Sequence, residues 1–122
     1  MVAVLGADDD PSRAGFYVPA CLAWQRYRVL PVNPVKVGQT LFGEPVRASL
    51  GELAEPVDVV DVFRRPDALA GHLSEVLAIR PLPTVVWLQS GISEDEFADK
   101  LVAAGIDVVQ DQCMLVLHRA WF

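Results

Sequence analysis

Short apolar blocks alternate along the chain with longer segments in which apolar residues recur at helical spacing. The blocks with the composition of buried strands are Val2–Leu5, Arg28–Val32, Val57–Phe63, Thr84–Leu88 and Asp107–Val109. Such alternation is typical of a parallel sheet covered by helices on both faces. We therefore predict an α/β fold, a doubly wound domain with a five-stranded parallel sheet in three layers, α/β/α.

The segment between the first two blocks predicts the first helix. Val18, Leu22 and Trp24 form its apolar face. Pro19 lies in the same segment, and because proline is tolerated in a first turn but breaks a helix interior, it predicts that this helix begins close to it.

Two further helices are expected in the second half of the chain. The segment Pro66–Arg80 carries one apolar stripe and is followed by two prolines, which end it. Ser93 and Glu96 have the spacing of a capping box, and apolar residues then recur at helical spacing until Gly105. These patterns indicate crossover helices between the last three strands.

The length of the chain and the stretch Pro34–Pro56 bear on domain organisation. The chain has 122 residues, which corresponds to one domain spanning 1–122. Pro34–Pro56 is rich in Gly and Pro and contains one candidate helical turn at Ser49–Leu53. It predicts an excursion from the domain and not a linker between two domains.

Composition and charge exclude several classes of protein. The 52% hydrophobic content argues against disorder, and the formal net charge of −6 argues against binding to a nucleic-acid backbone. No apolar block reaches the roughly 18 residues of a membrane span, and no export signal precedes the first block, so the cytoplasm is the expected location. Cys21 and Cys113 are far apart in sequence and are expected to be free thiols.

The candidate binding residues follow the strands, because ligands of doubly wound sheets bind beyond the carboxyl ends of the strands. The candidates are Gly6, Ala7, Asp8, Pro11, Ser12, Arg13, Asn33, Pro34, Lys36, Phe63, Arg64, Gln89 and Gly91.

The turn after the first block suits an anion and also carries features that oppose one. Gly6 and Ala7 allow a diphosphate to approach the backbone at a helix N-terminus. The carboxylates of Asp8–Asp10 repel phosphate, and turn formation or helix capping is the alternative interpretation of these residues. Arg13 supplies a compensating charge.

The next two strand ends favour a phosphorylated ribose over NAD. NAD-binding domains place an acidic residue after the second strand, where this chain has Asn33 and, three residues later, Lys36. The alternative interpretations are a simple turn residue for Asn33 and a solvated lysine for Lys36. The third strand ends in Phe63, Arg64 and Arg65, and two arginines at a strand end of an acidic protein indicate an anionic ligand.

No catalytic or metal-binding constellation is visible in the sequence. His72 is expected on the exposed face of its helix, and His118 stands near the C-terminus; neither has a carboxylate neighbour at a strand end. No cluster of His, Cys and Asp has metal-ligand spacing. We therefore predict a binding protein and not an enzyme.

The turns and strand ends also carry five short motifs. They are Gly6-Ala7, Pro11-Ser12-Arg13, PVNP at 31–34, VDVVDVFRRP at 57–66 and VWLQSG at 86–91. Together with Asp111, Cys113 and His118, these motifs resemble the small bacterial and archaeal CoA-binding domain proteins over nearly the whole chain. The resemblance implies a single Rossmann-like domain related to the CoA-binding domain of the succinyl-CoA synthetase α subunit.

The same resemblance implies CoA, or an acyl-CoA, at the carboxyl edge of the sheet. It places the residues from Gly6 to Arg13 near the diphosphate, Asn33–Lys36 near the adenosine phosphate, and Phe63 and Arg64 beside the nucleotide. Asp8 stands where the family has serine, so weakened phosphate binding is expected. The helix that precedes the first strand in the family is not seen, which predicts a sheet face that is uncovered or covered by a partner.

The leading hypothesis is therefore a cytoplasmic, non-catalytic CoA-binding or acyl-CoA-binding module used for sensing or regulation. Its partners would be this small nucleotide ligand and, over the uncovered face, a second copy or another protein. An NAD(P)-binding, oxidoreductase-like domain is one alternative, although the GxGxxG motif is missing. A phosphoacceptor receiver domain is another alternative, but it needs an aspartate at the end of the third strand and a lysine at the end of the fifth, where this chain has Phe63-Arg64 and Gln110-Asp111. A domain that has lost its ligand is the remaining alternative, because of Asp8.

Overall fold

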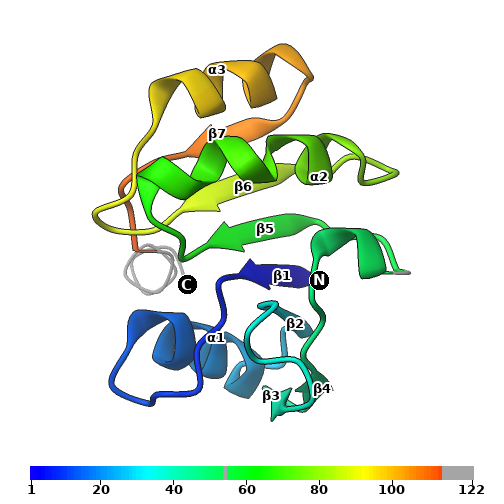
Figure 1. Ribbon diagram of the computed structural model, residues 1–122, viewed down its shortest axis with the longest axis vertical. Coiled ribbons are helices and arrows are strands. Elements are labelled where there is room, and N and C mark those ends of the chain that lie inside the picture. The colour runs from blue at the N-terminus through cyan, green and yellow to red at the C-terminus, as the bar shows by residue number, and fades with distance from the viewer. Residues whose placement is uncertain (54, 114–122) are drawn as a thin grey trace.

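The computed structural model describes residues 1–53 and 55–113 (Figure 1). Five strands form one parallel sheet in the order β2-β1-β5-β6-β7. The strands are β1 (Val2–Leu5), β2 (Val29–Val32), β5 (Val59–Val62), β6 (Val85–Leu88) and β7 (Asp107–Val109). All five coincide with predicted blocks, so the predicted α/β fold is confirmed.

Helices and a small hairpin connect these strands. They are α1 (Ala14–Trp24), the 3₁₀ helices η1 (Leu50–Glu52) and η2 (Pro66–His72), α2 (Leu73–Leu77), α3 (Asp95–Ala103), and the hairpin strands β3 (Thr40–Leu41) and β4 (Glu44–Pro45). Among the described residues, no helix has the length and apolar character needed to cross a bilayer.

Helices cover both faces of the sheet because alternate residues of each strand point in opposite directions. On one face, residues of β1, β5 and β6 pack with η2, α2 and α3; this cluster includes Ala3, Leu5, Val60, Val62, Leu69, Val76, Val86, Leu88, Phe97 and Leu101. On the other face, α1 packs on β1 and β2 through Leu22, Val2, Val4 and Val29. The domain is therefore doubly wound.

The winding direction reverses between β1 and β5. The chain proceeds from β1 to its neighbour β2 on one side, and then returns to place β5, β6 and β7 in succession on the other side. The arrowheads of β1, β5 and β6 point the same way in Figure 1, so the turns after these strands lie along one edge. A crevice forms at such a switch point because the two following connections leave toward opposite faces.

The segment Pro34–Pro56 forms the predicted excursion and contains, in addition, a small hairpin that was not predicted. The predicted helical turn is present as η1, and β3 pairs with β4 around Gly43, whose φ of +79° suits the turn. Two-residue strands carry too little alternation to be found from sequence. The chain then returns beside β2, where Arg47 N–H donates to Pro31 O at 3.1 Å and Asn33 N–H donates to Arg47 O at 2.9 Å.

Two predictions about α1 were wrong. Pro19 is the sixth residue of the helix and not part of its first turn, and the i−4 carbonyl that it leaves unpaired, Gly15 O, accepts from Asp8 N–H at 3.1 Å instead. The turn before the helix therefore replaces the missing helical bond. Trp24, predicted on the apolar face, is 87% exposed because it is the last helical residue and Leu22 occupies the buried position.

The other two predicted helices form with different boundaries. In the segment Pro66–Arg80, the apolar stripe is buried at Leu69 and Val76. The first half of this segment is the 3₁₀ helix η2, and the α-helix α2 that follows ends at Leu77. The capping box is also corrected, because the N-cap of α3 is Glu94. Its carboxylate accepts from the N–H groups of Glu96 and Phe97 at 3.3 and 3.1 Å. An acidic cap satisfies free N–H groups and also complements the helix dipole.

The packing of α3 gives a stability prediction. Leu101 is fully buried against the sheet, whereas its neighbour Val102 is 58% exposed. Leu101→Ala should lower the free energy of unfolding by about 2–5 kcal/mol through lost burial and a cavity. Val102→Ala should change it by no more than about 0.5 kcal/mol. Urea unfolding of both variants measures the difference, and equal effects would mean that α3 does not pack as described.

Candidate functional site

Two cavities open at the carboxyl edge where the winding direction reverses. The larger, of about 540 Å³, lies on the α1 side, and the smaller, of about 280 Å³, lies on the side of η2 and α2. Gly6, the first residue after β1, lines both. The two cavities therefore flank one backbone segment at the crevice that the fold predicts.

Gly6 is the point at which a side chain cannot be accommodated. Its φ is +86°, and a Cβ added to it would lie 2.8 Å from Phe63 O and 2.9 Å from Arg64 Cδ. Gly15 makes the second close approach, because its Cβ would lie 3.0 Å from Gly6 O. Glycine at these two positions thus brings the first turn against both the end of β5 and the start of α1.

The N-terminus of α1 faces the larger cavity. Ala14 and Gly15 both line it, and their N–H groups have no acceptor within the described ranges. The N-cap residue, Arg13, provides no side-chain cap. Free N–H groups and the positive end of the helix dipole make this an environment that favours an anion.

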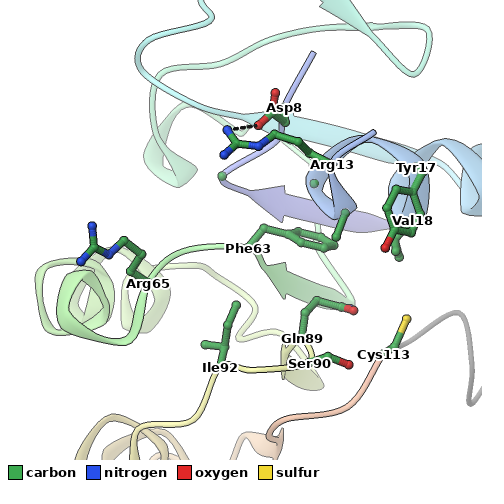
Figure 2. Close-up of a pocket in the computed structure, with 13 residues that line it drawn as sticks. Asp8, Arg13, Tyr17, Val18, Phe63, Arg65, Gln89, Ser90, Ile92 and Cys113 are labelled. Atoms are coloured by element: carbon green, nitrogen blue, oxygen red, sulfur yellow. Dashed lines mark hydrogen bonds and ion pairs between the residues drawn. The ribbon is translucent and has the colours of Figure 1, made fainter. Parts of the chain in front are cut away.

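The acidic turn before α1 is satisfied by its own residues. Asp8 accepts from Asp10 N–H at 3.0 Å and pairs with Arg13 at 3.4 Å. Asp10 accepts from the backbone and hydroxyl of Ser12, which lowers the pKa of the Asp10 carboxyl. The turn interpretation of this cluster is confirmed, whereas capping of α1 by these side chains is not observed. Asp8 nevertheless lines the cavity, with Arg13 beside it (Figure 2).

Asn33 and Lys36 hold the turn after β2 instead of lining a cavity. Asn33 Nδ2 donates to Ala7 O at 2.8 Å, and Asn33 Oδ1 accepts from Val35 N–H at 3.0 Å. Lys36 Nζ lies 3.0 Å from Asp9 Oδ1, and this contact lowers the pKa of Asp9. Both predicted ligand groups are engaged in joining the first and second turns.

The remaining predicted residues divide between the cavities and their surroundings. Phe63 and Gln89 line the larger cavity, and Pro34 and Arg64 line the smaller one. In Figure 2, Phe63 extends from the end of β5 toward α1, and Arg65, which precedes η2, also lines the larger cavity. Pro11 and Ser12 are in the exposed part of the turn, and Ala7 is buried beneath it.

Gly91 is not a free backbone donor. Its N–H donates to Asp111 Oδ1 at 2.6 Å, which fixes the turn after β6 to the segment after β7. The Gly91 N–H is therefore engaged within the protein. Its neighbours Ser90 and Ile92 line the larger cavity instead.

Asp61 is a buried acid that sequence reasoning missed. It lies in the middle of β5, is fully buried, and accepts from Gln89 Nε2 at 2.5 Å through Oδ1. Oδ2 has no hydrogen-bond partner among the described residues. Burial raises the pKa of Asp61 to about 7, and the hydrogen bond from Gln89 opposes this shift only in part. An aspartate inside an apolar block was the available sequence signal.

His72 is also corrected by the structure. Its side chain is 19% exposed, not solvated, and Nδ1 lies 2.6 Å from Glu75 Oε1. Both residues line the smaller cavity with Arg64 and Ser49. The carboxylate that sequence reasoning did not find near His72 is thus three residues away on the same helical segment.

Several lining residues had no signal in the sequence, since they come from helices and loops that only the fold brings to this edge. In the larger cavity they include Tyr17 and Ile92, and in the smaller cavity Ala48, Ser49 and Glu75. His118 lies outside the described residues. Within those residues, no group of three or more His, Cys, Asp or Glu side chains is placed to hold a metal ion.

A doubly wound sheet with a glycine-lined crevice and a helix N-terminus at its switch point defines a Rossmann-like α/β domain. The family model of the CoA binding domain matches residues 1–119, and the chain belongs to this family.

Relatives from bacteria and archaea match nearly the whole chain. A Thermus thermophilus structure described as cell-free ID.343 is 58% identical, with a TM-score of 0.96 over 99% of this chain and 89% of that one. A hypothetical protein from Pyrococcus horikoshii OT3 is 27% identical, with a TM-score of 0.88 over 98% and 81% of the two chains. The uncharacterized protein YneT of Bacillus subtilis (strain 168) is 34% identical over 96% of this chain and 84% of its own length.

The buried acid predicts an unusual pH dependence of stability. A pKa raised to about 7 in the folded state means that Asp61 stabilises the fold most below pH 4 and loses this contribution as the pH rises through 7. The loss amounts to roughly 4 kcal/mol. In Asp61→Asn, which cannot ionise, this part of the pH dependence should disappear. Urea unfolding of both proteins from pH 4 to pH 8 measures it.

The exposed residue Asp99 supplies the control for this comparison. Asp99→Asn should follow the wild-type pH profile, because this exposed substitution leaves the buried carboxyl of Asp61 in place. A stability difference between wild type and Asp61→Asn that is independent of pH would show that Asp61 ionises normally.

Proposed function

We propose that the protein binds CoA or an acyl-CoA, without chemical change, across the carboxyl edge of the sheet. The observation that carries the proposal is the position of Gly6, which lines both cavities and, because it has no side chain, lets the first turn lie against the end of β5. An extended ligand with polar and apolar parts fits two cavities joined over one glycine better than a compact ligand does.

The local chemistry supports the following arrangement of CoA in this proposal. The diphosphate crosses Gly6 and meets the free N–H groups of Ala14 and Gly15 at the α1 N-terminus. The pantetheine arm enters the larger cavity, whose wall includes Phe63 and Val18. The adenosine then lies on the side of the smaller cavity, which is bounded by apolar atoms of β1, β2 and the following turn.

In the cell, the bound CoA would serve sensing or regulation in this proposal. Asp8, which lines the larger cavity, is engaged by Arg13, which favours binding over acid–base chemistry at that wall. In this proposal the cytoplasmic CoA pool is the signal. A second copy or another protein that reads the occupied state remains a prediction.

Ligand-dependent melting is the direct test of CoA binding. CoA at 100 times its dissociation constant should stabilise the fold by about 2.7 kcal/mol, which is a rise in Tm of roughly 8–12 °C for a domain of this size. NAD should give a smaller rise, because Asn33 stands where an acid would bind its ribose. A larger rise with NAD would reverse the assignment.

Gly6→Ala tests whether the ligand crosses this residue. Gly43→Ala is its matched control, since both residues have positive φ but a Cβ on Gly43 would meet nothing within 4 Å. Both variants should lose stability, and only Gly6→Ala should also lose the CoA-dependent rise in Tm. If both variants keep that rise, the diphosphate does not pass over Gly6.

Asp8 gives a second prediction about the same site. A carboxylate in the wall of a diphosphate site repels the ligand, so Asp8→Ser should tighten CoA binding several-fold in calorimetric titration, and most at low salt. Asp9→Ser is the control, because Asp9 pairs with Lys36 and lines neither cavity. Equal or weaker binding by the Asp8 variant would mean that the turn bonds of Asp8 matter more than its charge.

A further inference from the structure

The outward face of α1 carries an apolar stripe that is open to solvent. The helix contains no charged residue, and Leu22 is among the side chains that pack it on β1 and β2. On the side away from the sheet, Trp24 is 87% exposed and Tyr17 is 48% exposed, with the half-buried Ala20 and Cys21 between them. A surface helix normally presents polar side chains to water, so this face has the composition of a covered surface.

The order of side chains along this stripe suits packing against itself. Ala20, Cys21 and Trp24 follow Tyr17 by three, four and seven positions, which places all four on one side of the helix. The order is aromatic, small, small, aromatic, and it is the same in either direction. An isologous interface joins the same patch of two copies across a two-fold axis. In antiparallel packing, Tyr17 would therefore meet the partner's Trp24.

The two ends of α1 carry opposite unpaired charges. In the acidic turn before the helix, Asp8 and Asp9 each hold a cation, whereas Asp10 makes no ion pair with any described residue. Arg26 lies just after the helix and is likewise without an ion pair among the described residues. Antiparallel packing brings the basic end of one copy beside the acidic end of the other, and it also aligns the two helix dipoles favourably.

Arg26 is an unusual residue for its place in the backbone. Its φ is +74°, a conformation in which glycine is the usual residue, and its side chain is exposed. The nearby Arg28 is held by Glu44 and Glu55, so Arg26 is the cation that this end of the helix offers to a partner. A charged side chain at a position that favours glycine contributes to an interface more readily than to the fold.

We propose that two copies of this chain associate through antiparallel α1 helices, with Tyr17 and Trp24 at the centre and Asp10 beside the partner's Arg26 at the rim. The order of side chains and the end charges are both complementary to the same surface, which favours a second copy over an unrelated protein. Interfaces that bury less than about 1,200 Å² in total are transient, and a stripe of two helical turns falls in this class. We therefore expect a weak dimer, with a dissociation constant of about 1–100 μM.

Sedimentation velocity of the full chain, without nucleotide, over about 1–200 μM tests the proposal. The wild type should change from monomer to dimer within this range. Trp24→Ser should raise the dissociation constant at least about 30-fold, as expected for a buried aromatic at the centre of an interface. Val102→Ser is the matched control, because Val102 is an exposed apolar residue of α3 on the other face of the sheet. It should leave the dissociation constant unchanged.

A charge exchange tests the antiparallel orientation. Arg26→Glu and Asp10→Arg each place like charges together at both rims, so each variant alone should weaken the dimer several-fold, and most at low salt. In an equimolar mixture of the two variants, a mixed dimer has opposite charges at both rims. The mixture should therefore dimerise about as tightly as the wild type. If neither variant alone weakens the dimer, the ends of α1 do not meet as proposed.

Three further results would overturn the proposal. A wild type that stays monomeric over the whole range would leave the stripe to a partner other than this chain. A dimer that persists in Trp24→Ser would use another face of the molecule. Equal weakening by Trp24→Ser and Val102→Ser would show that the effect is not specific to α1. Circular dichroism checks the fold of each variant, and the outcome is independent of CoA binding because no nucleotide is present.

Discussion

The close approach of the first turn to the end of β5 is the constraint on which the rest of this structure depends. Gly6 can lie against Phe63 O only because it has no side chain, and Gly15 brings α1 against Gly6 in the same way. The hydrogen bond from Asp8 N–H to Gly15 O then offsets the one that Pro19 removes from the helix. Strand, turn and helix are thus fixed together at the switch point, where a ligand of such a sheet binds.

Electrostatics divides this edge into satisfied and unsatisfied groups. Asp8 and Asp9 each hold a cation, so the acidic turn presents less charge to the crevice than its sequence suggests. Arg64 Nε and the two N–H groups at the start of α1 have no partners among the described residues. Unsatisfied donors gathered at a crevice favour an anionic ligand, because the oxygen atoms of such a ligand can accept the hydrogen bonds that the protein does not satisfy.

Asp61 is an ionisable residue in a buried position, where its charged form is unfavourable. Its position on β5 directs it away from the cluster of Val60 and Val62 and toward Gln89 on the neighbouring strand end. Gln89 also lines the larger cavity, so the buried acid is one hydrogen bond away from the proposed ligand. The protonation of Asp61 and the orientation of the Gln89 amide are therefore coupled through a single contact.

The sequence by itself determined the five strands, their parallel winding and the edge at which a ligand binds, because strand composition and helical period depend on neighbouring residues alone. It also identified Gly6, Phe63 and Arg64 at that edge. Only the tertiary structure decided that Asn33 and Lys36 hold a turn, that Pro19 fits inside α1, and that His72 meets Glu75 and Arg64 in a cavity. Partner choice among polar side chains depends on distances between segments far apart in sequence, and these distances exist only after the sheet has formed.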